Sequence, residues 1–105
     1  MDIINLVKDK GMSVGRINML EFETVDDLNK RADLYEKDAP TLFPTAEILL
    51  TIKTGPTTAM SVSVYPDKQS AEESLIRRDK HFKTAEIQPR EAWYLEGKVI
   101  QRHIK

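Results

Sequence analysis

Hydrophobic and polar positions alternate most regularly in residues 58–65. Successive side chains point to opposite sides of a β-strand, so this segment predicts a strand with two different faces. One face carries Met60, Val62 and Val64, and the other carries Ala59, Ser61, Ser63 and Tyr65. Pro66 ends the strand, and the apolar residues after Asp67 recur at helical spacing. Asp67 is therefore the predicted cap of a helix that continues to about Lys83.

A strand followed by a helix is also predicted near the N-terminus. Residues 16–23 alternate, with Asn18, Leu20 and Phe22 on one face and Ile17 and Met19 on the other. Thr24 can cap the following helix, and Asp27 stands where a capping box usually has Glu. Apolar residues then recur at helical spacing, at Val25, Leu28, Ala32, Tyr35 and Ala39. Pro40 disfavours helical geometry at the residue before it, so we expect the helix to end there.

Two further strands complete the pattern. Residues 46–53 alternate, and the turn at residues 54–57 is short enough to make an antiparallel hairpin with the strand after it. A connection interrupted by Pro89 leads to a final strand over residues 93–104, in which Gly97 predicts a bulge or a turn. The predicted order is therefore strand, helix, strand, strand, helix, strand.

This order is that of the ferredoxin-like fold, an α+β fold with β-α-β-β-α-β order and an antiparallel sheet. Two helices can cover only one face of such a sheet, and the other face still carries apolar side chains. An exposed apolar face predicts a partner, and the simplest partner is a second copy of the chain. Residues 15–105 form one domain in this interpretation. Residues 1–14 form either a short helix or an arm that packs on a partner subunit.

Composition and charge narrow the classes of partner. The 105 residues include 16 basic and 17 acidic side chains, and a net charge of −1 gives no attraction to nucleic acid or to an anionic membrane. The absence of cysteine excludes disulfides and thiolate chemistry. Two widely separated histidines without paired acidic ligands predict no metal site. The apolar runs are too short to span a bilayer, and the N-terminus lacks a signal-peptide pattern, so we expect a cytoplasmic protein.

Residues 62–74, together with residues 96–99, resemble the dimeric α+β barrel superfamily, and most of all its antibiotic-biosynthesis-monooxygenase-like domains. In those domains an aromatic residue at the end of the third strand precedes a short turn and the start of a helix. Tyr65 and the pair Ala71-Glu72 match these positions. The resemblance implies a homodimer whose two sheets close into an α+β barrel, with a cleft between sheet and helices in each subunit.

The same resemblance implies several alternative activities. Members of the superfamily perform cofactor-independent oxygenation of polycyclic aromatics, haem degradation or isomerisation of small signalling molecules, and many have no known activity. The haem-degrading branch uses an Asn on the first strand, and Asn18 matches it. That branch also uses a Trp and a His, and the corresponding positions in this sequence are Ser74 and a residue near Thr84. Because neither position carries the required side chain, haem degradation is disfavoured and no cofactor is expected.

Five side chains are candidates for a site in the implied cleft. Asn18 is either solvent-facing or an amide that hydrogen-bonds a substrate oxygen. Tyr65 and Trp93 either fill the core and the dimer interface or form a wall for a planar ligand. Arg78 either covers the core with its stem or holds an anionic ligand. His81 is either a solvated residue or a general base, so the hypothesis gives catalysis to Asn18, Tyr65 and His81, and ligand binding to Trp93 and Arg78.

Three functions remain open at this point. The first is a cofactor-independent monooxygenase or isomerase that acts on a hydrophobic or aromatic small molecule. The second is a non-catalytic dimer that binds a small molecule or regulates another process. The third is a structural dimer in which Tyr65 and Trp93 are used entirely for packing.

Overall fold

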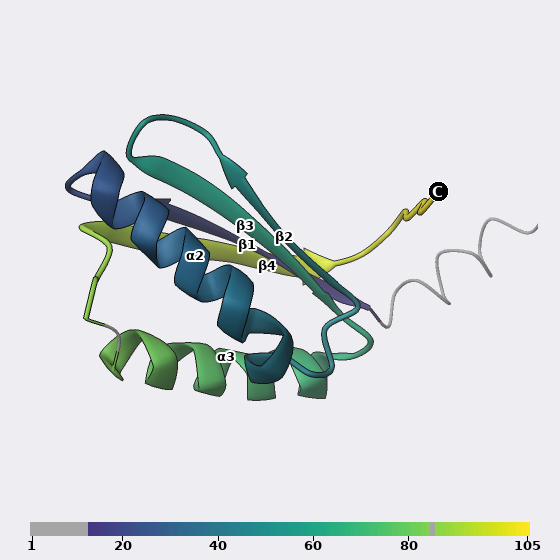
Figure 1. The fold of residues 1–105 in the computed structure, drawn as a ribbon. Helices are drawn as coiled ribbons and strands as arrows, with labels where there is room; N and C mark the ends of the chain where they lie inside the picture. The colour runs from purple at the N-terminus through teal and green to yellow at the C-terminus, as the bar shows by residue number, and fades with distance from the viewer. Residues whose placement is uncertain (1–12, 85) are drawn as a thin grey trace, which may run out of the picture.

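A computed structural model describes residues 13–84 and 86–105 of the chain (Figure 1). The predicted arm or helix over residues 1–14 therefore falls almost entirely outside the described residues. The elements are β1 (Val14–Glu21), α2 (Val25–Leu42), β2 (Ile48–Lys53), β3 (Thr58–Tyr65), α3 (Lys68–Thr84) and β4 (Glu91–Lys98). Their order confirms the predicted ferredoxin-like arrangement.

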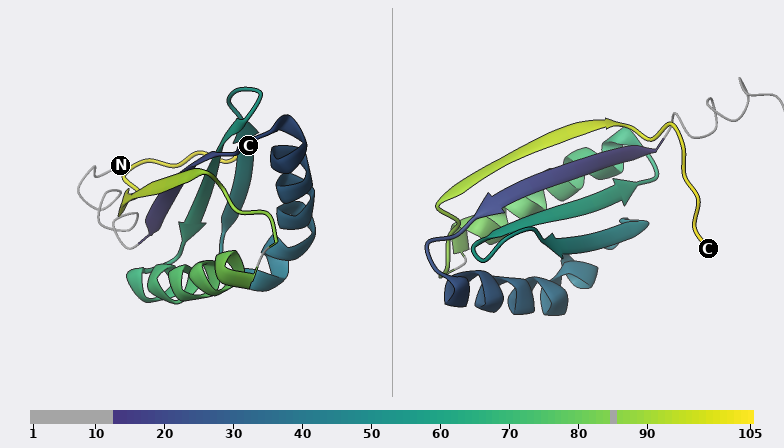
Figure 2. Two further views of the ribbon diagram at one scale, coloured as in Figure 1. Left: turned by 90° about the vertical axis from the view of Figure 1, so that its left-hand side faces the viewer. Right: turned by 90° about the horizontal axis from the view of Figure 1, so that it is seen from above.

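The four strands form one antiparallel sheet in the order β2-β3-β1-β4. Both helices lie on the same face of this sheet, and the opposite face carries no helix of the described chain (Figure 2). The central strand β1 pairs with β3 on one side and with β4 on the other, so that Asn18 lies opposite both Ser61 and Tyr94. The predicted hairpin of β2 and β3 is confirmed, with Leu50 opposite Val62.

Helix α2 begins as predicted and ends later than predicted. The Thr24 hydroxyl accepts a hydrogen bond of 3.0 Å from the backbone N–H of Asp27, so the capping residue is confirmed. The helix continues through Pro40 to Leu42, which corrects the predicted end at the residue before the proline. Proline there removes one N–H donor, but the helix ends within the next turn, where the N–H of Phe43 bonds the carbonyl of Ala39 at 2.8 Å.

The predicted aspartate, Asp67, caps helix α3. The Asp67 carboxylate accepts a hydrogen bond of 2.7 Å from the backbone N–H of Ser70, and this bond lowers the pKa of Asp67 below its ordinary value. Ala71 and Ser74 then face the sheet and are almost completely buried. The small side chains allow α3 to approach the sheet at its N-terminal half.

The last strand differs from its predicted bounds. β4 starts two residues earlier than expected and ends at Lys98, because its length is set by pairing with β1 over the whole of that strand. Gly97 pairs in register with Gly15, so the predicted bulge or turn is wrong. Beyond the strand, Val99 donates to the carbonyl of Ser13 at 3.0 Å, and Arg102 forms an ion pair of 3.1 Å with Glu47.

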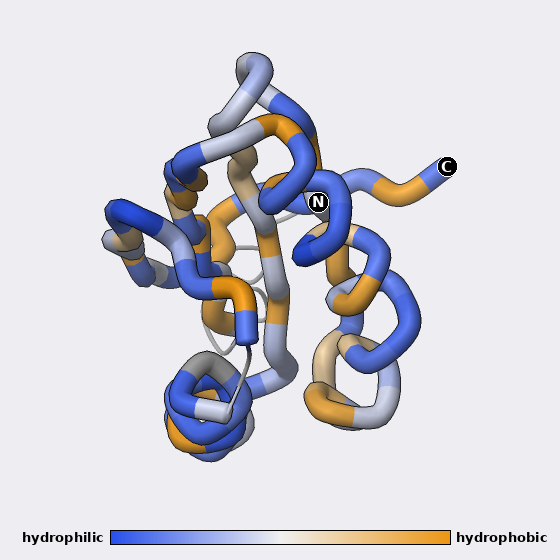
Figure 3. Tube along the Cα trace, turned by 60° about the vertical axis from the view of Figure 1, so that its left-hand side comes forward, coloured by the Kyte–Doolittle hydropathy of each residue, from blue (hydrophilic) through white to orange (hydrophobic). Residues whose placement is uncertain are grey.

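The two faces of the sheet differ in polarity, and Figure 3 shows the underlying alternation along the strands. Positions toward the helices include the buried side chains of Arg16, Asn18, Ser61, Ser63 and Tyr65. Most positions on the opposite face are apolar, and Ile17, Leu50, Ile52, Trp93 and Leu95 on it are each more than a third exposed. We call this second surface the open face.

Candidate functional site

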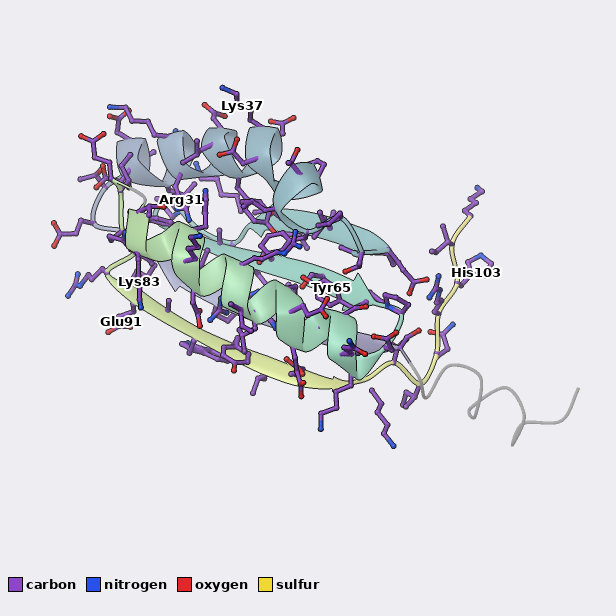
Figure 4. The ribbon with its side chains drawn as sticks, turned by 90° about the horizontal axis from the view of Figure 1, so that it is seen from below. Arg31, Lys37, Tyr65, Lys83, Glu91 and His103 are labelled. Atoms are coloured by element: carbon purple, nitrogen blue, oxygen red, sulfur yellow. The ribbon has the colours of Figure 1, made fainter. Side chains whose placement is uncertain are left out.

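A pocket lies between the sheet and the helices; its cavity volume is about 50 Å³, and the hollow measures about 620 Å³ when the open solvent at its mouth is included. Its polar wall is built by Arg16, Asn18, Ser61, Ser63, Tyr65, Arg31, Tyr35, Thr51 and Arg78. Its apolar wall is built by Leu20, Phe22, Leu28, Ala32, Phe43 and Ala59. Figure 4 shows Arg31 and Tyr65 between the two helices, with Lys37 and His103 at the periphery. Three of the candidate residues, Asn18, Tyr65 and Arg78, therefore share one space.

Arg16 anchors the pocket to three elements and is only 1% exposed. Its guanidinium donates to the Glu96 carboxylate of β4 at 3.1 Å and to the Ser74 hydroxyl of α3 at 2.9 Å. A third bond reaches the carbonyl of Ala71 at 2.6 Å. A buried cation is stable only when such partners replace its water, and here the partners also tie β1, β4 and α3 together.

Two tyrosine rings lie against arginine guanidinium groups at one end of the pocket. The central carbon of the Arg16 guanidinium is 5.4 Å from the ring centre of Tyr65 and 5.8 Å from that of Tyr94. The corresponding carbon of Arg78 is 4.7 Å from the ring centre of Tyr94. These are cation–π distances, and they hold flat aromatic and guanidinium surfaces next to each other.

Asn18 is buried on the pocket side and is held by hydrogen bonds at both ends of its amide. Its carbonyl oxygen accepts a bond of 2.6 Å from Arg78, and its amide nitrogen donates to the Ser61 hydroxyl at 3.3 Å. Arg78 also pairs with Asp79 at 3.0 Å, on the outer side of α3. The structure thus places Asn18, Tyr65 and Arg78, three of the five predicted site residues, around one cavity. Their catalytic and binding roles stay predictions.

His81 lies outside the pocket lining and contacts it through Arg31. The Arg31 guanidinium is 3.1 Å from His81 Nδ1, and the Asp38 carboxylate is 3.7 Å from His81 Nε2. A guanidinium has only donors, so Nδ1 accepts and the ring is the neutral tautomer with its proton on Nε2. Burial lowers the pKa of His81, the charge of Arg31 lowers it further, and Asp38 opposes both. The imidazole therefore supports an arginine of the pocket and does not face the cavity.

Tyr35 lies beside Tyr65 on the helix side of the pocket. Burial raises the pKa of the Tyr35 hydroxyl to about 12. The phenol is consequently protonated throughout the neutral range and acts there as a hydrogen-bond donor. A role as general base at neutral pH is excluded for this group.

The electrostatic character of the pocket follows from its lining. Arg16, Arg31 and Arg78 bring three guanidinium groups to it, and none of the lining residues in the described part of the chain is Asp, Glu or His. Glu96 and Asp79 outside the lining offset part of this charge, so the lining suits a negatively charged group mainly through its guanidinium, tyrosine, serine and amide hydrogen-bond donors. Proton transfer by a lining carboxylate or imidazole has no candidate among these residues.

Trp93 is separated from the other four predicted residues. It lies opposite Met19 on β1, on the open face, and is 55% exposed. The reason is strand parity, since the neighbouring residue Tyr94 points to the helix side and takes the place at the pocket mouth that a β4 aromatic was expected to fill. The prediction that Trp93 stacks on a ligand with Tyr65 does not fit this geometry.

Several residues of the site were missing from the sequence-based candidates. Arg16 is two positions before Asn18 in the same strand, so parity alone places both on one face. Arg31 is three residues after Leu28, on the side of α2 that was predicted to face the core. Strand parity for Arg16 and helical spacing for Arg31 were both visible in the sequence. Charged side chains on predicted core faces are, however, usually assigned to the surface.

No family model and no curated protein matches this sequence. Solved structures do match it. A protein of unknown function from Nitrosomonas europaea, NE2512, aligns over 91% of this chain and 97% of its own, with a TM-score of 0.75 and 12% identity. A dimeric ferredoxin-like protein from an uncultured marine organism aligns over 93% and 97%, with a TM-score of 0.70 and 13% identity.

A third match is SnoaB, a cofactor-independent oxygenase from Streptomyces nogalater. It aligns over 86% of this chain and 95% of its own, with a TM-score of 0.66 and 9% identity. The chain has the fold of the antibiotic-biosynthesis-monooxygenase-like proteins. The predicted resemblance is thereby confirmed at the level of the fold, while identities this low carry no residue roles across. No helix in the described ranges has the length and apolarity that a membrane span requires.

Proposed function

We propose that this protein is a cofactor-independent monooxygenase for a small, planar, hydroxylated aromatic molecule, which the pocket binds as its oxyanion. The observation that carries the proposal is the set of three guanidinium groups in a pocket whose described lining includes no carboxylate. Such a lining stabilises a phenolate or enolate and lowers the pKa of the bound hydroxyl. The flat apolar wall and the tyrosine rings suit an aromatic skeleton.

Dioxygen reacts with electron-rich oxyanions without an additional redox group. The bound anion transfers one electron to dioxygen, and the resulting radical pair forms a carbon–oxygen bond to give a hydroperoxide after proton uptake. When the bound oxyanion is the enolate of a ring ketone that carries a CH₂ group, loss of water from the hydroperoxide converts that CH₂ to a second ketone, so that CH₂ and O₂ give C=O and H₂O. The residues contribute by holding the anion and stabilising negative charge as it moves to oxygen.

Each pocket residue has a separate part in this proposal. Arg78 and the amide of Asn18 hold the substrate oxyanion, and Tyr65 donates a hydrogen bond to it. Arg31 adds positive charge, while His81 acts as a positioning residue by accepting a hydrogen bond from Arg31. Proton removal needs no protein base here, because a hydroxyl acidified by the pocket loses its proton to water.

We also infer that the protein is a homodimer in which the open faces of two copies meet. Ile17, Leu50 and Leu95 share that face and are between 39% and 60% exposed in the single chain. Continuous apolar surface of this kind is unfavourable in water and suits a two-fold interface. The ferredoxin-like structure from an uncultured marine organism that matches the chain is itself dimeric, which supports a dimer. A cytoplasmic location remains the expectation from sequence.

Anthrone tests the proposed reaction, because its CH₂ group is acidified by two aromatic rings and a ketone. The protein should accelerate conversion to anthraquinone in air, with one atom of ¹⁸O from ¹⁸O₂ in the product and no conversion under nitrogen. Arg78→Met should lower the rate by about tenfold to a hundredfold, the effect expected for a lost bond to a charged group. Arg77→Met, at the exposed neighbouring arginine, is the matched control and should keep the wild-type rate.

A non-catalytic small-molecule-binding protein is the second candidate. It is favoured by the same absence of an acid or base from the described lining, since tight binding of an anion needs none. It predicts that a bound phenol is ionised in the wild-type protein but is recovered unchanged in air. Equal conversion of anthrone with wild-type protein, with Arg78→Met and without protein would reject the oxygenase and leave the binding function.

A further inference from the structure

A second hollow adjoins the pocket on the side of the edge strand. It is a groove between α2 and β2 with about 980 Å³ of empty space, including open solvent at its mouth. The pocket and the groove share five lining residues, Leu28, Ala32, Tyr35, Thr51 and Ala59. The same side chains therefore form walls of both spaces, and the two hollows are neighbours at this junction.

Small side chains account for the opening between α2 and the sheet. Ala32 and Ala39 stand on the side of α2 that faces the sheet, and Thr51 and Ala59 stand on the strands beneath it. A larger residue at any of the four small positions would narrow the passage.

Polarity changes from the pocket to the groove. The pocket end carries Arg16 and Arg78, whereas the groove walls are mostly apolar, with Leu28, Ala39 and Leu49 among them. Charged side chains return at the outer rim, where Lys53 and Glu36 line the groove together. A ligand that matches this order is polar and anionic at one end and apolar along its length.

We propose that pocket and groove bind one elongated ligand, an aromatic ring bearing an oxyanion in the pocket with an unbranched apolar chain in the groove. This inference rests on the proposed function for the ring and extends it to the chain. The chain passes between Ala32 and Thr51, and the groove selects for its length. A compact polycyclic substrate without a side chain would leave the groove empty, and the groove would add nothing to its affinity.

The expected dependence on chain length follows from the shape of the groove. A methylene group that is fully buried raises affinity by about fourfold, and one buried on a single side raises it by about twofold. The groove is open to solvent along one side, so about twofold per methylene is expected. The gain should stop when the chain reaches the rim at Lys53.

A series of 4-n-alkyl-2-nitrophenols, from methyl to hexyl, separates the two parts of the ligand. The nitrophenolate absorbs visible light, so a pH titration of the bound probe reports the pKa of its hydroxyl in the pocket. Isothermal titration of each member reports how affinity depends on the chain. A lowered pKa tests the anionic ring site of the proposed function, and the chain-length slope tests the groove.

Thr51→Phe should close the junction from the sheet side, and Thr51→Val, which keeps the size of the side chain, is its matched control. Because Thr51 also lines the pocket, the phenylalanine variant is compared with itself: longer probes should bind it no more tightly than the methyl probe does. The valine variant should keep the gain from longer chains. Ala32→Leu approaches the junction from α2 and provides a second block if the first variant does not fold.

The outcomes distinguish the groove from the pocket. Equal affinity of the wild type for methyl and hexyl probes would overturn the inference while leaving the ring site intact. A chain-length slope that survives both blocking variants would also overturn it, because the chain would then lie elsewhere. If the chain-length slope is present but the hydroxyl pKa of the bound probe is unchanged, the proposed oxyanion site fails and the apolar groove stands.

Discussion

The two faces of the sheet differ in an unusual way: the covered face carries buried polar side chains among its apolar core residues, whereas the open face carries exposed apolar ones. On β1, Arg16 is 1% exposed beneath the helices, whereas its neighbour Ile17 on the other side is 39% exposed. The covered face holds arginine, asparagine and serine, and the uncovered face holds aliphatic residues and a tryptophan. The buried polar side chains suit the ligand proposed above, and the exposed apolar side chains suit the subunit interface proposed for the open face.

The two faces also differ in how they are stabilised. The polar face depends on specific hydrogen bonds with defined directions, such as those from Arg16 to Glu96 and to Ser74. On the open face, stabilisation would come only from the apolar area that an interface buries, because apolar burial has no preferred direction. Substitutions on the open face should therefore act through association, and substitutions on the helix side should act through folding and binding.

The largest effect is expected from Ile17→Asp on the open face. Dimerisation would bury two unpaired carboxylates, and we expect the dimer dissociation constant to rise more than about a hundredfold. Sedimentation velocity over a dilution series measures this change. The chain has one tryptophan, Trp93, which lies on the same face, so its emission should shift to longer wavelength when the dimer separates.

Ile76→Asp is the matched control for this prediction. Ile76 is 71% exposed on α3, on the helix side of the molecule, and its substitution should leave the dimer unchanged. A wild-type protein that sediments as a monomer at micromolar concentration, or an Ile17→Asp variant that dimerises normally, would contradict the assignment of the open face.

The next largest effect is expected from Arg16→Met on the helix side. The variant leaves the Glu96 carboxylate, the Ser74 hydroxyl and the Ala71 carbonyl without their shared donor, and should lower the free energy of unfolding by about 2–3 kcal/mol. Urea denaturation at one fixed protein concentration measures it. The double variant Arg16→Met/Glu96→Gln removes the unpaired charge and should recover part of the loss; a double variant less stable than the single one would contradict this account of the network.

A smaller effect is expected from Tyr65→Phe in the pocket. Losing one hydrogen-bond donor to the bound oxyanion should weaken binding of 4-methyl-2-nitrophenol about fivefold, corresponding to about 1 kcal/mol. The bound probe's hydroxyl pKa should rise relative to the wild type. Tyr94→Phe, at the pocket mouth, is the comparison, since its ring contacts the arginines but its hydroxyl has no part in the proposal. Equal losses in both variants would argue against a specific bond from Tyr65.

The smallest effect concerns pH and His81. Burial and Arg31 lower the pKa of His81 in the folded protein below its ordinary value of 6.5. The unfolded chain therefore binds this proton more readily, and the stability from a neutral His81 is complete above pH 6.5 and is lost as pH falls through the lower folded value. Thermal unfolding from pH 8 to 5 should show a weaker decline for His81→Gln than for the wild type. The exposed His103→Gln should behave like the wild type.

Sequence reasoning predicted the elements well because they depend on local pattern. The capping by Thr24 and Asp67 and the bounds of β3 follow from residues within one turn or one strand. Pro40 was misjudged because a proline in the last turn removes only one helical donor. Gly97 was misjudged because its regular pairing is imposed by Gly15 on β1, which lies 82 residues earlier in the sequence.

The site was predicted only in part because its contacts are tertiary. The parity of β1 and β3 correctly places Asn18 and Tyr65 on one side. The partners of Arg16 are 58 residues away at Ser74 and 80 residues away at Glu96, and no local pattern connects them. The choice between Trp93 and Tyr94 depended on the register of β4, which its incorrectly predicted bounds could not supply.

The floor of the pocket has a consequence for protein engineering. On β3 it consists of Ala59, Ser61 and Ser63, three of the smallest side chains, while the alternate residues of the same strand belong to the open face. Alternate residues of one strand therefore have two separate roles: one set lines the pocket, and the other belongs to the face proposed as the subunit interface. A library varied at the three floor positions could reshape selectivity while leaving quaternary structure untouched.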